Sequence, residues 1–399
     1  MQNAVLVVVS LVVSALAAEA ALSIAGCSYP SFRRADLHTG LALRSGAQGW
    51  WREEGESFVR INSAGVRDDR EIDVARGKDV IRVATFGDSY AEALQVPVQR
   101  TFWRLPGGRL QQCGFASGRR IEVLNFRVSG YSTGQELLSL RHRAAAYLPD
   151  LVVLAFLSGN DARDNSRWIA GRYPRPYLQL AGDGTLSVDN AFREHWIFRI
   201  KSSRIWALGD QLRLMQLVNK VKNIVGQPLS AAGAQAGRSE LGLDDEVYRS
   251  QPPPAWERAW RLTEAIVAAM RHESAAIGAG FLLVTLSNPV QVAADPARSR
   301  DLAERLGEKD LVYPERRMRA FAEREAVDAV FLAEEFAAHA TKTGVHLHGF
   351  ADTRPDSGHW NEQGHALAAA LVARRLCSHP CVPPQAAPGS SAGKAGRPG

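Results

Sequence analysis

Cysteine is scarce in this sequence, with four residues among 399. Four cysteines are too few to hold together a fold built on disulfides, so the chain must depend on a hydrophobic core. Cys377 and Cys381 are near enough in the chain to close a small loop in an oxidising compartment, and two inert thiols are the alternative. The pair lacks further ligands nearby, so it does not indicate a metal site.

Compact basic runs and aromatic-basic repeats are also missing, although the formal net charge is +6 and the isoelectric point is near 9.3. The arginines are scattered, which favours a solvated basic surface over a nucleic-acid partner. No internal repeat is evident, and 46% of the residues are apolar, which is enough for one large core. We therefore expect one principal domain with appendages and no nucleic-acid partner.

The N-terminus carries one long apolar run, Ala4 to Gly26, in which Glu19 is the only charge. At about 1.5 Å per helical residue this run can cross a bilayer core of about 30 Å. We expect a membrane anchor or signal segment over residues 1–27, preferably an uncleaved transmembrane helix, with a periplasmic or extracytoplasmic body. Glu19 and the downstream pair Arg33-Arg34 argue against this topology.

Two other interpretations of the N-terminus remain open. The first part of the apolar run is also typical of a signal peptide, with small residues near Ala17 as a cleavage site. Ile24-Ala25-Gly26-Cys27 resembles a lipobox, whose cysteine would be acylated. All three interpretations export the body of the protein.

Apolar, β-rich runs recur along the chain, and helical patterns follow them, which is the order of a parallel sheet covered on both faces. The fold predicted is α/β: a doubly wound, mostly parallel five-stranded sheet flanked by helices in three layers. The predicted strands are Val80 to Phe86, Ile121 to Phe126, Leu151 to Leu157, Phe281 to Leu286 and Ala329 to Leu332. The predicted helices include Gln135 to Tyr147, Trp256 to Met270 and a last helix from about Asn361 to Leu376.

The order of the predicted strands and helices sets the domain boundaries. We expect an N-terminal extension over 28–78 and the main domain over 79–376. An insertion or lid at about 166–250 interrupts the main domain with a Gly-Asp-Gly turn at 182–184 and an Ala/Gly/Ser-rich stretch. The tail, 377–399, is rich in Pro, Gly, Ala and Ser, and a disordered segment is predicted there.

Ser89 is the first candidate for chemistry, because the strand ending at Phe86 runs directly into Gly87-Asp88-Ser89-Tyr90. Open α/β sheets place their sites at the carboxyl ends of the strands. The sequence is not the G-x-S-x-G elbow, since Ala91 stands where the second glycine would be. An ordinary strand-to-helix turn, capped by Ser or Asp, is the alternative.

Two further turns meet the same edge of the predicted sheet. Gly130 follows the second strand and Asn160 follows the third. A glycine lets a backbone N–H approach a reacting oxygen, and an asparagine amide can donate a second hydrogen bond to the same point. Both are also ordinary turn residues.

The histidine candidate is His359, in Asp356-Ser357-Gly358-His359-Trp360-Asn361. An aspartate three residues earlier can hold the imidazole in one tautomer while its other nitrogen faces the serine. His346 and His348 could ligate a metal, but no partner ligand set is visible. His365 is expected to serve in packing or capping.

Together these blocks, GDSY, NFRVSGYSTGQ, SGND and DSGHWN, resemble the SGNH (GDSL-type) hydrolases in order and spacing over about residues 79–376. The resemblance implies that Ser89 is the nucleophile, His359 the general base and Asp356 its orienting partner. It assigns the oxyanion hole to Gly130, Asn160 and the backbone N–H of Ser89. The departure from the family is Ser158, which stands where its third block often has glycine.

The apolar N-terminus, the stretch 62–67 and the insertion also resemble a bacterial subgroup of the family that is associated with cell-envelope polysaccharides. The expected function is that of a serine esterase that removes acyl groups, in particular O-acetyl, from a carbohydrate or envelope polymer through an acyl-enzyme. No cofactor or metal is expected. An O-acyltransferase with the same residues and an inactive polysaccharide-binding module are the alternatives.

Overall fold

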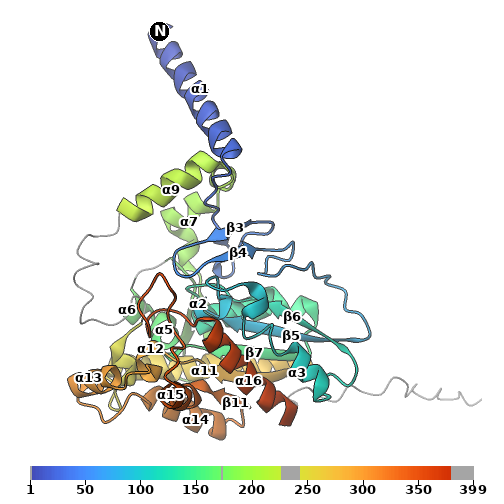
Figure 1. The fold of residues 1–399 in the computed structure, drawn as a ribbon, viewed down its shortest axis with the longest axis vertical. Coiled ribbons are helices and arrows are strands. Elements are labelled where there is room, and N and C mark those ends of the chain that lie inside the picture. Colours follow the sequence, from blue (N-terminus) through green and yellow to red (C-terminus); the bar gives the residue numbers. More distant parts are fainter. Residues whose placement is uncertain (1, 172–173, 226–242, 379–399) are drawn as a thin grey trace, which may run out of the picture.

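The computed structural model describes residues 2–171, 174–225 and 243–378. Its centre is a sheet of five parallel strands in the order β11-β10-β7-β5-β6 (Figure 1). The strands are β5 (Val80–Gly87), β6 (Arg120–Asn125), β7 (Leu151–Phe156), β10 (Gly280–Thr285) and β11 (Ala329–Phe331). Each lies within one residue of its predicted bounds. The predicted doubly wound α/β fold is confirmed, with β5 at the point where the strand order reverses.

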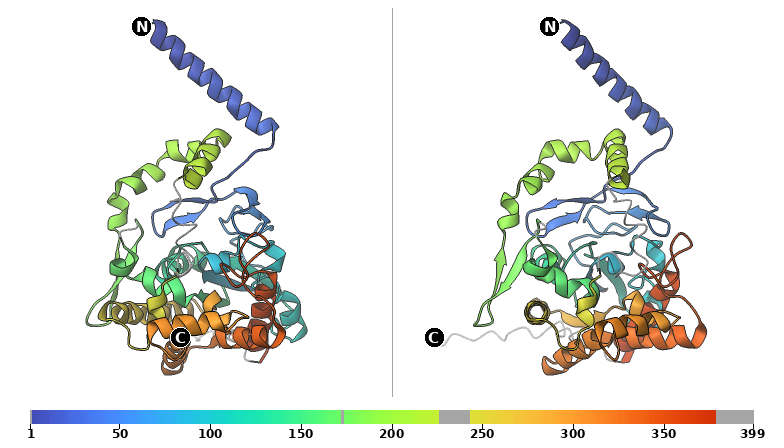
Figure 2. Two further views of the ribbon diagram at one scale, coloured as in Figure 1. Left: turned by 60° about the vertical axis from the view of Figure 1, so that its left-hand side comes forward. Right: turned by 90° about the vertical axis from the view of Figure 1, so that its left-hand side faces the viewer.

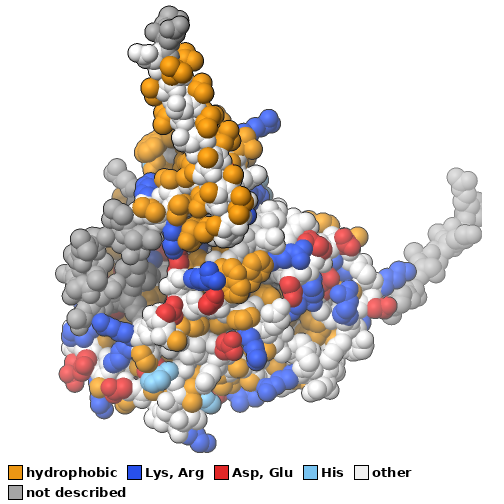
Figure 3. Space-filling view, turned by 45° about the horizontal axis from the view of Figure 1, so that its top comes forward, with side chains coloured by type: hydrophobic (Ala, Val, Ile, Leu, Met, Phe, Trp, Pro, Cys, Tyr) orange, Lys and Arg blue, Asp and Glu red, His pale blue; other side chains and the backbone are white. Residues whose placement is uncertain are grey.

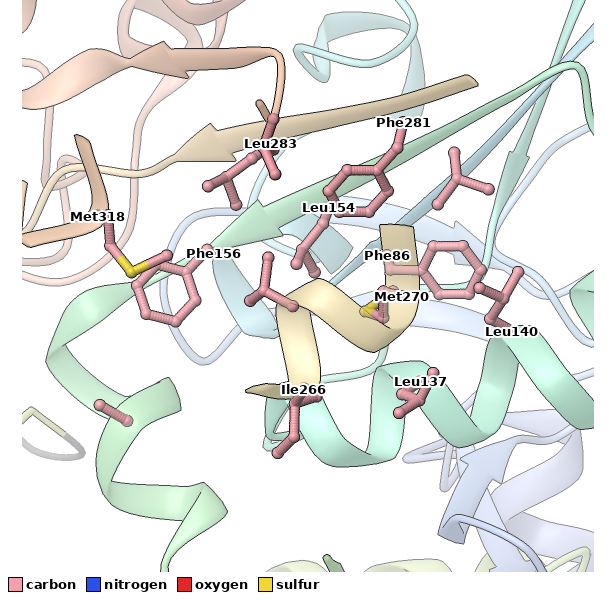
Figure 4. Packing of buried hydrophobic residues seen from close by; sticks show 14 of the residues in the cluster. Phe86, Leu137, Leu140, Leu154, Phe156, Ile266, Met270, Phe281, Leu283 and Met318 are labelled. Atoms are coloured by element: carbon pink, nitrogen blue, oxygen red, sulfur yellow. The ribbon is translucent and has the colours of Figure 1, made fainter. Parts of the chain in front are cut away.

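Helices cover both faces of this sheet, as the uniformly buried strands β5 and β7 require. On one face, α4 (Thr133–His142), α11 (Pro254–Ala276), α13 (Ala297–Leu306) and α14 (Tyr313–Arg324) contribute to a single hydrophobic cluster. Figure 4 shows Phe86 and Leu154 of the sheet packed against Leu137 of α4 and Met270 of α11. The apolar stripe predicted from Trp256 to Met270 is therefore core packing.

The opposite face is covered by short helices and by the end of the chain. Its cluster draws on α3 (Gly107–Gln112), α12 (Pro289–Val292), α15 (Leu332–Thr343) and α16 (Glu362–Ser378). Asn361 caps α16, since its Oδ1 accepts from the backbone N–H groups of Gln363 and Gly364. The last helix thus begins where the sequence predicted.

The N-terminal extension forms two antiparallel hairpins above the carboxyl edge of the sheet (Figure 1). Their strands are β1 (Arg33–Asp36), β2 (Gly40–Leu43), β3 (Gln48–Trp51) and β4 (Ser57–Arg60). A third apolar cluster joins the hairpins to the main domain, with Val59 and Ile61 packed against Leu94 and Tyr131. The extension is therefore part of the folded body rather than a linker.

The insertion begins after α5 (Ser158–Asn165) and contains its own small elements. They are α6 (Arg167–Ala170), β8 (Tyr177–Leu180), β9 (Leu186–Asp189), α7 (Trp196–Lys201), α8 (Arg204–Gly209) and α9 (Arg213–Val225). The predicted turn at 182–184 joins the antiparallel strands β8 and β9. Figure 2 shows α7, α8 and α9 arching over the N-terminal hairpins, on the side of the body from which α1 projects. The Ala/Gly/Ser-rich stretch, 226–242, lies outside the described residues.

The chain begins with α1 (Gln2–Ile24), which projects away from the body (Figure 1). Within the described ranges, α1 is the one helix long and apolar enough to cross a membrane, and none of that window is buried. Length and composition alone fit an anchor or a signal.

One disulfide joins Cys113, at the end of α3, to Cys377 in α16. The expected pairing of Cys377 with Cys381 is wrong, because Cys377 continues the last helix and faces Cys113, with 5.7 Å between the Cα atoms. Cys381 and the predicted tail from residue 379 lie outside the described residues. The N-terminal apolar helix and the disulfide together indicate an extracytoplasmic location.

Candidate active site

Ser89 is the first residue of α2 (Ser89–Glu92), directly after the end of β5. Gly87 has a φ of 153°, and a Cβ there would press on Ala155 of the neighbouring strand, so this sharp turn needs glycine. Asp88 caps the helix by accepting a 3.0 Å hydrogen bond from the Tyr90 backbone N–H. The side chains around the turn are buried, while Ser89 itself stays partly exposed.

The imidazole of His359 is held by a carboxylate that the sequence analysis did not single out. Glu54, in the turn between β3 and β4, accepts at Oε2 from His359 Nδ1 at 2.5 Å and at Oε1 from the His359 backbone N–H at 2.7 Å. Although burial opposes ionisation, these hydrogen bonds and the charge of His359 hold the pKa of Glu54 below its usual range. Glu54 therefore fixes both the main chain and the ring of His359.

Asp356, which the sequence predicted in this position, contacts different groups. Its Oδ2 accepts from the backbone N–H of Ala294 at 3.1 Å and lies 2.8 Å from His346 Nδ1. Asp356 has a φ of 53°, which turns the chain sharply just before the histidine. The structure thus gives Asp356 a position in the loop that precedes His359, and the ring of His359 is bonded to Glu54 instead.

The other nitrogen of His359 is directed to the interior of the site. Among the residues that the structure describes, His359 Nε2 is a buried atom without a hydrogen-bond partner. The ring lies against Tyr90, with 4.6 Å between the ring centroids. Tyr90 directly follows Ser89, so the ring of His359 lies against the residue next to the candidate nucleophile. A buried ring nitrogen left without a partner is costly unless a reacting group uses it.

The two predicted oxyanion donors lie on the loops that follow β6 and β7. Gly130 has a φ of 81°, and a Cβ there would meet nothing within 4 Å, so its backbone borders open space. Asn160, on α5, donates from Nδ2 to Asp88 Oδ2 at 2.7 Å. An amide has two N–H donors, so this bond orients Asn160 and leaves one proton for another acceptor. The structure therefore links Asn160 to the turn that carries Ser89 through Asp88, and burial raises the pKa of Asp88.

Residues of the N-terminal extension also hold α2, the helix that begins at Ser89. The buried guanidinium of Arg67 donates to the backbone carbonyls of Glu92 and Ala93, at the end of α2, and to Val96 O at 2.6 Å. Burial lowers the pKa of Arg67 to about 10, but this pKa is still high enough for the guanidinium to be charged at neutral pH. Glu92 in turn accepts from the Ser129 backbone N–H at 2.6 Å, next to Gly130. The extension thus contributes to the geometry of both α2 and the Gly130 loop.

Two other histidines, His348 and His365, are almost completely buried. His348 lies 2.9 Å from Gly358 O through Nδ1, and Tyr90 donates its hydroxyl to the same carbonyl at 2.8 Å. Burial lowers the pKa of His348 to about 3, so it is neutral. His365 is buried and stacks on Phe102, which agrees with the predicted packing role.

Sequence reasoning missed Glu54 because nothing in its local pattern distinguishes it. Glu53-Glu54-Gly55 has the composition of an ordinary hairpin turn. Its partner is 305 residues away, so spacing gives no signal. The sequence analysis also set residues 28–78 apart from the main domain, so it gave no reason to look there for a partner of His359.

Comparisons with known proteins agree with the fold. No family model and no curated protein matches this chain. Among solved structures, Axe2, an acetylxylan esterase from Geobacillus stearothermophilus, is 14% identical, with a TM-score of 0.37, over 74% of this chain and 94% of that one. The acetyl xylan esterase AlAXEase is 14% identical, with a TM-score of 0.38, over 75% and 98%. TesA is 15% identical, with a TM-score of 0.35, over 74% and 97%.

These three proteins are similar to this chain in fold, at low identity. With TM-scores of 0.35 to 0.38, this likeness carries no information on the family, the activity or the substrate of this chain. The function must therefore be argued from the site.

Proposed function

We propose that this protein is a membrane-anchored serine esterase in which Ser89 is the nucleophile, His359 the base and Glu54 the carboxylate that orients His359. The observation that carries the proposal is the imidazole of His359, which is bonded to Glu54 through Nδ1 and has a buried Nε2 without a partner among the described residues. A carboxylate on Nδ1 leaves Nε2 with its lone pair, which is the form that can accept a proton.

The proposed reaction has two steps of acyl transfer. Ser89 Oγ attacks the ester carbonyl and its proton passes to His359 Nε2, which then protonates the leaving alkoxide. The resulting acyl-enzyme is hydrolysed by water, whose proton passes to the same nitrogen, and the serine is regenerated. Glu54 stays ionised and stabilises the imidazolium that forms in each step.

The oxyanion in this proposal is held by three N–H donors. They come from the backbones of Ser89 and Gly130 and from the second amide proton of Asn160. Asp88 supports this arrangement because its carboxylate accepts from Asn160 and caps α2 at the same time. Gly130 contributes because open space lies beside its Cα.

The substrate class proposed is an O-acetylated carbohydrate of the cell envelope, in keeping with the export expected from the N-terminal helix. The decisive experiment is labelling with a fluorophosphonate, followed by mass spectrometry of the labelled peptide. We expect adduct on Ser89 and none in Ser89→Ala. Absence of labelling in the folded wild-type protein would favour the inactive polysaccharide-binding module.

A panel of acetylated sugars against long-chain lipid esters then defines the acyl group. Acetyl release into water supports the esterase, whereas transfer of acetyl to an added sugar hydroxyl without release would make the protein an O-acyltransferase. Both outcomes require Ser89 and His359.

A further inference from the structure

Three consecutive helices of the insertion turn large apolar side chains outward. In α9, Met215, Val218 and Val221 are 40%, 50% and 49% exposed. Large apolar side chains of α7, α8 and the turn before α9 are exposed as well: Trp196, Ile200, Ile205, Leu208 and Leu212. We call these eight side chains the apolar face of the insertion. Soluble monomers rarely expose so many neighbouring large apolar groups, and such a patch marks a surface for another apolar phase.

The polar side of α9 points toward the protein, which is the reverse of a soluble surface helix. Gln216 is buried, and its Oε1 accepts from the Tyr29 backbone N–H at 2.9 Å. Lys220 forms a 3.0 Å ion pair with Glu53, in the turn that also carries Glu54. The body thus binds Gln216 and Lys220 of α9, whereas Met215, Val218 and Val221 stay outside.

The end of α1 is bonded directly to the start of α9. The Glu19 carboxylate accepts from the backbone N–H groups of Arg213 and Leu214, each at 2.9 Å, and so caps α9. The Arg213 guanidinium donates back to Cys27 O at 2.9 Å. The one charge within the apolar run therefore has a partner on the insertion. If α1 were removed as a signal peptide, the first turn of α9 would lose its cap.

From these contacts we propose that α1 is retained and that the apolar face of the insertion lies in the headgroup region of the bilayer that α1 spans. α9 contacts the base of α1, and Figure 3 shows apolar side chains gathered around that base, so a membrane around α1 meets both helices. The basic side chains Arg199, Lys201, Arg204 and Lys222 lie on the same helices, as suits anionic headgroups. This inference does not depend on the esterase activity.

The test measures how deeply single positions sit in lipid. Full-length protein with Cys27→Ser and Cys381→Ser is reconstituted in vesicles of phosphatidylethanolamine and phosphatidylglycerol. Val218→Cys carries an environment-sensitive fluorophore on the apolar face. The matched control is Val74→Cys, because Val74 is also exposed, at 54%. Its carbonyl accepts from Arg82 in the first half of β5, away from the end that carries Ser89.

We expect the label at position 218 to be quenched by nitroxide-bearing lipids and to be several-fold less accessible to aqueous iodide than the label at position 74. Met215→Cys should behave like Val218→Cys, which guards against a local effect of one substitution. Equal iodide quenching at 218 and 74 would overturn the proposal. So would shielding at 218 that depends on protein density and not on lipid nitroxides, because a second copy would then cover the face. A mature wild-type chain that begins near residue 18, or at an acylated Cys27, would overturn the retention of α1.

Discussion

Glu54 and His359 meet across 305 residues of chain, and the Glu54 carboxylate binds both the ring Nδ1 and the backbone N–H of the histidine. Two contacts from one carboxylate fix the position and the rotation of the imidazole together. The aspartate three residues before the histidine, which sequence reasoning assigned to this role, is bonded to His346. The proposed triad thus draws its acid from a hairpin that precedes the sheet.

The first prediction compares these two carboxylates. Glu54→Gln should lower kcat/KM by about 10²–10⁴, because the amide neither selects the same tautomer nor stabilises the imidazolium. Asp356→Asn, the matched control, should cost less than about tenfold, since Asp356 would act only through its loop. Steady-state kinetics on a soluble acetyl ester measures both. If Asp356→Asn is the more damaging change, the assignment of Glu54 fails and Asp356 regains its predicted role.

The same pair of variants differs in pH dependence. His359 lowers the pKa of Glu54 below the ordinary glutamate value of about 4.3. In the folded protein this carboxylate is therefore ionised at every pH above that value, and it loses its charge only when the pH falls below it. In Glu54→Gln the imidazolium has lost its counter-charge, so the acid limb of the kcat/KM profile should move to lower pH. Asp356→Asn should leave that limb in place. A purely structural role for Glu54 would lower activity at every pH without moving the limb.

The second prediction concerns Asn160. Asn160→Ala should lower kcat by about 10²–10³ with little change in KM, which is the usual result of removing one oxyanion donor. Circular dichroism should show an unchanged fold, because the lost bond is the one to Asp88. A rise in KM at constant kcat would instead assign Asn160 to binding of the ground state.

The third prediction uses two glycines with the same backbone conformation. Gly358 has a φ of 70°, and a Cβ on it would overlap Glu54 Oε1. Gly344 has a φ of 69°, and a Cβ there would meet nothing within 4 Å. Both Gly→Ala changes should cost about 1–2 kcal/mol of folding stability for the left-handed conformation. Only Gly358→Ala should also lower activity toward that of Glu54→Gln. Equal activity of the two variants would mean that Glu54 does not need its observed position.

The fourth prediction concerns the disulfide between Cys113 and Cys377. Cys377→Ser should lower the free energy of unfolding by about 2–5 kcal/mol, because the bridge closes a loop over 264 residues. Cys27→Ser is the control, since Cys27 is an exposed free thiol. Denaturant unfolding under non-reducing conditions compares them. A free Cys113 thiol in the unreduced wild-type protein, found by alkylation and mass spectrometry, would contradict this pairing.

The parallel sheet was predictable from the sequence because its strands are continuous apolar runs that end in turns, a local signal. The turns that carry Ser89, Gly130 and Asn160 could be located for the same reason, since each follows such a run, and the roles of these residues stay predictions. The partner of His359 could not be predicted, because a carboxylate in a hairpin turn shows no trace of a contact made in three dimensions. The partner of Cys377 was predicted wrongly for a similar reason, because Cys381 is close to it in the chain whereas Cys113 is 264 residues away.

The distance along the chain between Glu54 and His359 also bears on how the active protein forms. Contacts between such remote segments require nearly the whole chain to be ordered, and long-range contacts of this kind form slowly. During synthesis, the hairpin with Glu54 emerges early and His359 emerges close to the C-terminus. Under the proposed function, ester hydrolysis should therefore be the last property gained, because it needs the contact between Glu54 and His359.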